Sequence, residues 1–340
     1  MWIHRFLIQA VALSLAMLPS VDAQAQKPSP PAQSGSAAVA PAKGDFGRVR
    51  SKKRKVARPV GKPGPQRWPT KRPAVSPAPL QIPAMGAIPF PPGERLAFKI
   101  QILGVQAGEV MLGVGAPTMK GEIPVVPLVG WIRSSSAFSK VYSIDDRLEV
   151  LVDQRTFLPL RSDFYIAEAG KKLSYHTEFN QAGKLISSRR VQKKDRDLVR
   201  DFTPVREVYD AMSSVYAARR MNLVPGLKFA YYIWDGRKER LISVVVVGQE
   251  KIYTELGWFD CMKIELVAAT TGGFMSGKEL NEPAKKGAAW IALDAARTPV
   301  KVVTETRIGD VTGEIYRRFV DPKDAAAAAR LSPQAAPTTP

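Results

Sequence analysis

Cysteine and histidine are nearly absent from this chain, which has one cysteine and two histidines among its 340 residues. A single thiol, Cys261, forms no internal disulfide, and its strand-like surroundings indicate a small buried side chain rather than a reactive one. The usual zinc centres combine three or four histidine and cysteine ligands. The sequence therefore predicts no metal site and no cofactor.

Histidine chemistry is limited to His176, because His4 lies in an N-terminal stretch with the features of an export leader. A Ser-His-Asp triad would have to use His176. Residues 172–179 alternate between polar and apolar side chains, so we expect His176 in a cross-strand ladder. No catalytic residue is assigned from the sequence.

Apolar runs long enough to cross a bilayer are also missing. The N-terminal run Phe6–Leu18 holds 13 mostly apolar residues, fewer than a membrane-spanning helix needs. It follows Arg5, and small residues between positions 21 and 25 suit a signal peptidase. This pattern predicts a signal peptide over residues 1–25 and no transmembrane helix after cleavage. We expect the mature protein to work outside the cytoplasm, where ATP and nicotinamide cofactors are scarce.

Acidic residues are scarce in residues 26–92, which hold 13 lysines and arginines, 15 of the 28 prolines and one acidic residue, Asp45. Few apolar side chains are available there to offset the entropy of ordering, so the stretch predicts a disordered, basic, Pro-rich tether. Behind an export signal this charge points to an anionic envelope surface and not to nucleic acid. A spacer without a partner is the alternative. Residues 322–340, rich in Ala and Pro, are expected to form a disordered tail.

The body, residues 93–321, alternates between apolar and polar side chains with a period of two. Leu96, Phe98 and Ile100 share one face, and residues 104–108 supply a turn before the next run. Short connections favour antiparallel order, so we expect an all-β meander curled into a sheet or half-open barrel. Further strands are predicted at 124–134, 146–153, 158–168, 171–180, 184–193, 227–234, 239–247, 250–256, 260–270, 287–293, 298–308 and 311–319.

One segment has a helical period instead. Thr203-Pro204 resembles an N-cap followed by proline, and apolar residues then recur every three or four positions up to Tyr216. Arg219 and Arg220 suit the C-terminal end of a helix dipole. The spacing predicts a single amphipathic helix of about five turns that packs on the sheet. A short helical turn is expected at 136–141.

Several short motifs follow one another in a fixed order along the body. They are Pro92-Gly93-Glu94-Arg95-Leu96, Ala107-Gly108, Asp210 with Ser213, Tyr216-x-x-Arg219, Gly226, Trp290, Asp294 and Arg297-x-Pro299-Val300. In this order and spacing, residues 93–320 resemble DUF3108, a bacterial exported family of unknown function. The resemblance implies a periplasmic envelope protein whose antiparallel sheet curls into an open barrel, similar to lipoprotein-carrier folds. It brings no catalytic residue set with it.

Residues 272–279 nearly match a phosphate-binding loop, but Glu279 stands where such a loop needs a hydroxyl. A carboxylate there would repel phosphates, and no helical pattern follows. The sequence therefore favours a surface loop beside the barrel mouth over a nucleotide site.

Aromatic side chains are the first set of candidate ligand-binding residues, because alternation directs some of them into a barrel. Those selected are Trp131, Phe138, Tyr142, Phe164, Tyr231, Trp234 and Trp290. A second, polar set is expected to have structural or functional roles. Asp210 would meet Arg219 or a strand-end backbone amide, and Asp294 would pair with Arg297 across a turn.

The sequence favours a non-catalytic envelope protein that binds an apolar or amphipathic, lipid-like ligand in an open barrel. An adaptor held at the envelope by its cationic tether is one alternative. A cell-wall glycan hydrolase that uses two of Asp145, Asp146, Asp210 and Asp294 is the other.

Overall fold

The computed structural model describes residues 82–192, 198–306 and 309–331. The predicted signal peptide and most of the predicted tether, up to residue 81, lie outside the described residues. Residues 332–340 of the predicted tail also lie outside the described residues.

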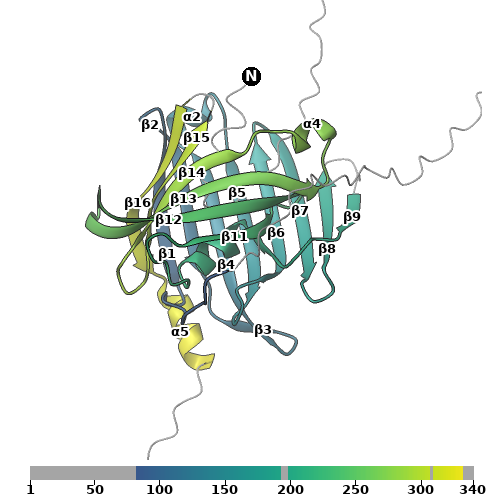
Figure 1. Ribbon diagram of the computed structural model, residues 1–340, viewed down its shortest axis with the longest axis horizontal. Helices are drawn as coiled ribbons and strands as arrows, with labels where there is room; N and C mark the ends of the chain where they lie inside the picture. Colours follow the sequence, from purple (N-terminus) through teal and green to yellow (C-terminus); the bar gives the residue numbers. More distant parts are fainter. Residues whose placement is uncertain (1–81, 193–197, 307–308, 332–340) are drawn as a thin grey trace, which may run out of the picture. The chain divides into compact units, whose positions relative to one another are not determined.

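Strands dominate the described chain, as the period of two predicts, and they form one large sheet (Figure 1). The strands are β1 Glu94–Ile102, β2 Val105–Val114, β3 Thr118–Lys120, β4 Ile123–Ser134, β5 Asp145–Asp153, β6 Pro159–Glu168, β7 Lys171–Asn180, β8 Leu185–Gln192, β9 Leu198–Phe202, β10 Val208–Asp210, β11 Lys228–Trp234, β12 Lys238–Thr254, β13 Gly257–Gly273, β14 Lys285–Ala292, β15 Pro299–Thr306 and β16 Gly309–Val320. The helices are α2 Ser136–Ser139, α3 Ala211–Ala218, α4 Gly277–Leu280 and α5 Pro322–Leu331.

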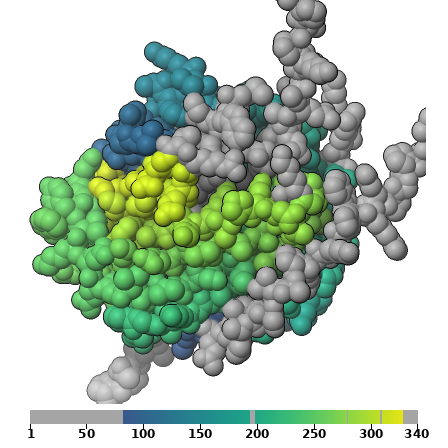
Figure 2. Space-filling view, turned by 45° about the horizontal axis from the view of Figure 1, so that its top comes forward, coloured from purple at the N-terminus to yellow at the C-terminus, as the bar shows by residue number. Residues whose placement is uncertain are grey.

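Neighbouring strands in the sheet are mostly neighbours in the chain, in the order β10-β11-β12-β13-β14-β15-β16-β1-β2-β4-β5-β6-β7-β8-β9. All of these pairs are antiparallel except β10 with β11. The late strand β16 lies beside β1, which joins the two ends of the body. Successive green to yellow strands form adjacent bands on one face in Figure 2. Within the described residues the sheet is not closed, since β9 and β10 end the strand order. The all-β, curled-sheet prediction is confirmed.

The predicted five-turn helix is wrong in length and in its starting point. Residues 203–207 are irregular, β10 follows, and α3 begins only after Asp210. The reason is local: the Asp210 side chain accepts the Ser213 amide while the Ser213 hydroxyl accepts the Asp210 amide, a capping box. Residues 239–247 and 250–256, predicted as two strands, form the single strand β12 because a bulge between Val246 and Gly248 absorbs the change in register.

Both ends of the body extend beyond the predicted boundaries. In the segment 82–92, assigned by the sequence to the disordered tether, Phe90 is buried and packs against Tyr216 and Phe157, with ring centroids 4.9 and 5.8 Å apart. The contacts of this one aromatic ring hold a Pro-rich segment that lacks an apolar period of its own. At the other end, α5 forms at residues 322–331, where a disordered tail was expected, because its alanine-rich sequence favours a helix.

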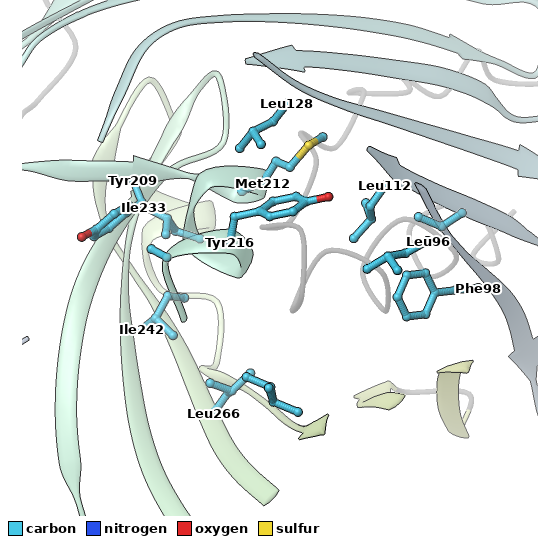
Figure 3. Packing of buried hydrophobic residues seen from close by; sticks show 14 of the residues in the cluster. Leu96, Phe98, Leu112, Leu128, Tyr209, Met212, Tyr216, Ile233, Ile242 and Leu266 are labelled. Atoms are coloured by element: carbon cyan, nitrogen blue, oxygen red, sulfur yellow. The ribbon is translucent and has the colours of Figure 1, made fainter. Parts of the chain in front are cut away.

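The core lies between α3 and the curved sheet. Tyr216 of α3 points toward Leu112 on β2, and the Met212 side chain lies beside Leu128 on β4 (Figure 3). A Cβ at Gly130 on β4 would lie 2.6 Å from the Met212 methyl group, so a larger residue there would require the end of the Met212 side chain to shift. Burying this apolar helix face inside the curve stabilises the open sheet, which has no second layer of helices to cover it.

Candidate functional site

An apolar cavity of about 70 Å³ lies between α3 and the concave face of the sheet. Its polar groups are few: the Ser214 hydroxyl, the Tyr231 phenol and Lys301, whose ammonium group is 3.5 Å from Glu314. The wall is formed by Phe98, Ile100, Val110, Leu112, Ser214, Val215, Ala218, Tyr231, Ile264, Leu266, Ala289, Ile291, Pro299, Lys301, Val302 and Gly313. Such a surface suits a hydrocarbon group and not a polar substrate.

Of the seven aromatic residues selected from the sequence, only Tyr231 lies on this wall. Trp131 has Arg147 over its ring at 5.9 Å, Phe138 is half-buried in α2, and Phe164 is in the core. Trp234 stacks on Phe202 with a centroid distance of 5.0 Å. The remaining two have polar partners: the Tyr142 hydroxyl donates to Glu168, and the Trp290 indole donates to Glu250.

Sequence reasoning missed the aliphatic wall, although part of the signal was present. Phe98 and Ile100 share a face by alternation, as do Val110 and Leu112 on the returning strand. That pattern shows which face is buried. It does not show whether the buried face is packed solid or leaves a space, which depends on where α3 lies.

The polar motif residues meet at the C-terminal end of α3. Arg219 donates to both carboxylate oxygens of Glu94, over 2.6 and 3.0 Å, and neither side chain is exposed. It also donates to the carbonyls of Ala296 and Arg297, at 2.8 and 3.1 Å. The Phe90 ring covers the guanidinium group at 4.3 Å. This arrangement ties α3 to β1 and to the loop before β15.

Two expected pairings of the polar set are replaced by others. Asp210 meets neither Arg219 nor a strand-end amide but caps α3 through the helix amide of Ser213 at 2.6 Å, because the capping box is local. The Asp294 side chain accepts from the Thr298 amide and hydroxyl and pairs with Arg318 at 3.2 Å, not with Arg297. The turn at residues 294–298 closes on itself in this way, and Arg297 offers its carbonyl to Arg219.

Asp146 and Glu168 form a buried carboxyl pair that the sequence did not reveal. Burial and the neighbouring Glu168 raise the pKa of Asp146 to about 8, and burial also raises the pKa of Glu168. The Tyr142 hydroxyl donates to Glu168 at 2.6 Å, and the Ala167 amide donates to Asp146 at 2.8 Å. Two carboxyl groups this close do not both ionise at low cost, so the pair retains a proton near neutral pH.

Each of the four carboxylates of the hydrolase alternative has different hydrogen-bond or ion-pair partners. Asp145 is exposed and pairs with Arg133 at 2.9 Å, whereas Asp146 is bonded within its own carboxyl pair. Asp210 caps α3, and Asp294 closes its turn. The structure therefore does not bring any two of these four into one reaction site.

His176 lies in a cross-strand ladder, as predicted, but with partners that resemble a triad. Its Nδ1 is 2.6 Å from the Asp163 carboxylate and its Nε2 is 3.0 Å from the Ser174 hydroxyl. The three residues belong to β6 and β7, and Arg161 holds both oxygens of Asp163. Because β7 is paired on both sides, its peptide N–H groups are committed to β6 and β8 and cannot bind an oxyanion.

The near match to a phosphate-binding loop folds as a short capped helix. Ser276 and Glu279 form a capping box at the start of α4, and Glu279 accepts from Arg237 at 2.5 Å and from Lys238 at 3.0 Å. These contacts hold the pKa of Glu279 well below its usual range, against the effect of burial. The carboxylate is thus a permanent anion where a nucleotide phosphate would have to bind.

Among the residues that the structure describes, no group of three or more His, Cys, Asp or Glu side chains is placed to hold a metal ion. Among the same residues, none of the helices has the length and apolar character needed to cross a bilayer.

Three solved structures are similar to this chain at low sequence identity. The crystal structure of a beta-barrel-like protein with the DUF1849 domain of unknown function from Brucella abortus has 8% identity and a TM-score of 0.44, and covers 67% of this chain and 97% of that one. An exported protein with a YmcC-like fold from Bacteroides fragilis has 10% identity and a TM-score of 0.33, covering 69% and 100% of the two chains. A lipoprotein from Parabacteroides distasonis has the same identity and TM-score and covers 69% and 99%.

No curated protein matches this chain. Residues 97–316, which include Arg219 and all the residues of the cavity wall, match the family described as proteins of unknown function, DUF3108. The match spans most of the chain, and the protein therefore belongs to the DUF3108 family.

Proposed function

We propose that this protein is a non-catalytic exported protein that binds the apolar part of an amphipathic ligand between α3 and the concave face of its open sheet. The apolar cavity beneath α3 is the observation that carries the proposal. Its wall comes from α3 and from seven strands of the sheet, so segments far apart in the chain form one apolar surface. Burial of acyl surface supplies about 0.8 kcal/mol per CH₂ group.

The size of the cavity sets a condition on this function. At about 70 Å³ it has roughly half the volume of the ~150 Å³ cavity that holds benzene in another protein. A long acyl chain therefore fits only when α3 moves away from β1 and β2. The helix has only eight residues, most of them buried, and the Asp210 capping box and Arg219 hold its two ends. In this proposal α3 acts as a lid whose opening exposes its buried face.

The place of action follows from the N-terminal sequence. The predicted signal peptide leads to the periplasm, and the basic residues up to 81 supply positive charge for an anionic envelope surface. In this proposal the tether holds the protein near a membrane while the body carries its ligand.

Native mass spectrometry of the full chain purified from a bacterial envelope extract tests the proposal. We expect an adduct with the mass of an amphiphile on the unmodified protein. Ala289→Leu fills the cavity from β14 and should abolish the adduct. The matched control is Ala288→Leu, the adjacent residue on the opposite face of β14, which should leave it unchanged. Absence of any adduct, together with no binding of a fluorescent acyl probe, would overturn the proposal.

An adaptor role is the second candidate, and the edge strand β9 favours it. Val199 on this strand is 60% exposed, and β9 ends the strand order of the described sheet. An uncovered strand edge can pair with a strand of another protein. For an adaptor, Val199→Lys should abolish co-purification of an envelope partner and leave binding of the acyl probe unchanged. For a carrier, no partner should co-purify with the unmodified chain.

A further inference from the structure

The face of the sheet that lines the apolar cavity carries basic residues farther along the same strands. On β14, Ile291 and Ala289 line the cavity, and Lys285 lies on the same face four residues before Ala289. The pairing of β14 with β13 confirms the face, because Ala289 is opposite Ile264, a cavity residue, and Lys285 is opposite the buried Ala268. At 3.4 Å per residue, Lys285 is about 14 Å along the strand from the cavity wall.

The neighbouring strand repeats this change from apolar to basic. On β12 the buried residues Ile242 and Val244 are followed toward the strand start by Arg240 and Lys238, both less than 5% exposed. Arg240 donates to Asp235 and to Thr270, at 3.1 and 2.8 Å. Positive charge therefore gathers at one end of the barrel interior.

Two arginines on β8 and β9, the strands at the far end of the strand order, lie near this basic region. Arg190 on β8 is paired with the buried Tyr175, and Arg200 on β9 lies over the Phe274 ring at 5.5 Å. The turn between β11 and β12 joins β7 and β8 to β12. The Gly236 carbonyl accepts from Ser188 at 2.8 Å, and a Cβ at Gly236 would lie 3.3 Å from Tyr175.

Three cations of this region have carboxylate partners. Arg237 and Lys238 pair with Glu279, and Arg240 pairs with Asp235. Lys285 and Arg190 differ from these three. Within the described part of the chain, Lys285 has no hydrogen bond or ion pair, and Nε of Arg190 is buried without a partner. Burial, with Arg240 and Lys238 nearby, lowers the pKa of Lys285 to about 7.

A partly buried positive charge without a counter-ion is costly, and an anion that enters the site removes this cost. We propose that the basic region around Lys285 and Arg190 binds the anionic headgroup, a phosphate or carboxylate, of the amphiphile whose apolar part occupies the cavity under α3. This inference rests on the proposed function and adds the chemical class of the ligand. It also gives the ligand an orientation, with the headgroup toward α4 and the chain toward β1 and β2.

Binding of matched probes to the full chain tests the headgroup and the chain separately. Dodecyl phosphate, dodecyl maltoside and inorganic phosphate are titrated by calorimetry, each detergent below its critical micelle concentration. We expect dodecyl phosphate to bind at least tenfold more tightly than dodecyl maltoside, and inorganic phosphate to bind more weakly than dodecyl phosphate. The preference should decrease as salt concentration rises.

Two neutral variants locate the anion. Lys285→Met and Arg190→Met should each weaken dodecyl phosphate binding about tenfold and leave dodecyl maltoside binding unchanged. The controls are Lys286→Met and Arg189→Met, the exposed neighbours on β14 and β8, which should bind both probes as the unmodified chain does. Should a variant fail to fold, the ratio of the two affinities in the unmodified chain still decides the question.

The outcomes separate this inference from the proposed function. Equal affinity for the two dodecyl probes overturns the anionic headgroup and leaves the carrier function standing. No binding of either dodecyl probe overturns the carrier function. Binding of inorganic phosphate as tight as that of dodecyl phosphate, lost in Lys285→Met, supports the anion site and overturns the contribution of the chain.

Discussion

Glu94 and Arg219 lie 125 residues apart in the chain and form a bidentate ion pair in which neither side chain is exposed. The pair joins the first strand of the body to the end of α3, the helix that covers the cavity. Breaking such a pair is costly, since removal of Glu94 leaves the Arg219 charge buried without a carboxylate partner, and removal of Arg219 leaves the buried Glu94 with only Arg318, 3.6 Å away. The contact therefore fixes the resting position of α3.

Removal of one partner of this pair should be strongly destabilising. We expect Arg219→Met and Glu94→Gln each to lower the free energy of unfolding by about 3–5 kcal/mol, measured by urea denaturation. The double variant should lose much less than the sum of the two, because no lone charge remains. Arg133→Gln, which breaks an exposed pair with Asp145, serves as the control and should cost under about 1 kcal/mol. Additive losses would contradict the proposed coupling.

The carboxyl pair of Asp146 and Glu168 predicts that stability decreases as pH rises. The pKa of Asp146 is raised to about 8 in the folded chain, from an ordinary value of 3.8, so between these values the folded state binds more protons than the unfolded state. Its stabilising contribution is complete below about pH 4 and is lost as pH rises toward 8. The slope reaches at most about 1.4 kcal/mol per pH unit for one proton.

Urea midpoints measured between pH 5 and pH 9 test the carboxyl pair. Asp146→Asn should flatten the profile, and Asp145→Asn, at the exposed neighbouring position, should leave it unchanged. A slope that survives in Asp146→Asn would assign the pH dependence to other groups.

The cap of α3 should depend on hydrogen-bond acceptance and not on charge. Burial raises the pKa of Asp210 to about 6, although its bonds to Ser213 oppose the shift. We expect Asp210→Ala to lower the free energy of unfolding by about 0.5–2 kcal/mol, and Asp210→Asn to cost a small part of that, because asparagine also accepts the Ser213 amide. Thermal denaturation near pH 7 measures the difference, and equal losses in the two variants would point to a role for the charge itself.

Truncation should reveal where the body begins. Deletion of residues 26–81 removes the basic stretch outside the described structure and should leave the free energy of unfolding unchanged. Deletion of residues 26–92 also removes the buried Phe90, which covers Arg219 and Tyr216, and should cost at least the ~3–5 kcal/mol typical of a lost core phenylalanine. Equal stability of the two truncations would show that Phe90 does not contribute to the core.

The single thiol should be inert until the chain unfolds. Cys261 is fully buried, and burial followed by Asp260 and Asp294 raises its pKa to about 11, so very little thiolate exists near neutral pH. We expect no reaction with a thiol reagent at pH 8 in buffer and one equivalent of reaction in denaturant. Rapid labelling of the folded protein would place Cys261 at the surface instead.

The sequence by itself determined the all-β class, the antiparallel order and the buried face of most strands, because a period of two and short turns are local properties that leave few other folds. Its predicted cross-strand position for His176 and buried setting for Cys261 were confirmed for the same reason. The helix was misplaced because Asp210 and Ser213 decide its start through two hydrogen bonds that no apolar period records.

Tertiary structure alone decided which residues meet. The partner of Arg219 is Glu94 and not the nearby Asp210, since β16 beside β1 and the turn at residues 294–298 bring distant segments to the end of α3. The cavity wall is mostly aliphatic, with Phe98 and Tyr231 as its aromatic members, because it is set by the position of α3 over β1, β2 and β13–β15. The surroundings of Lys285 and Arg190 likewise come from different strands of the sheet, so no single strand in the sequence predicts them.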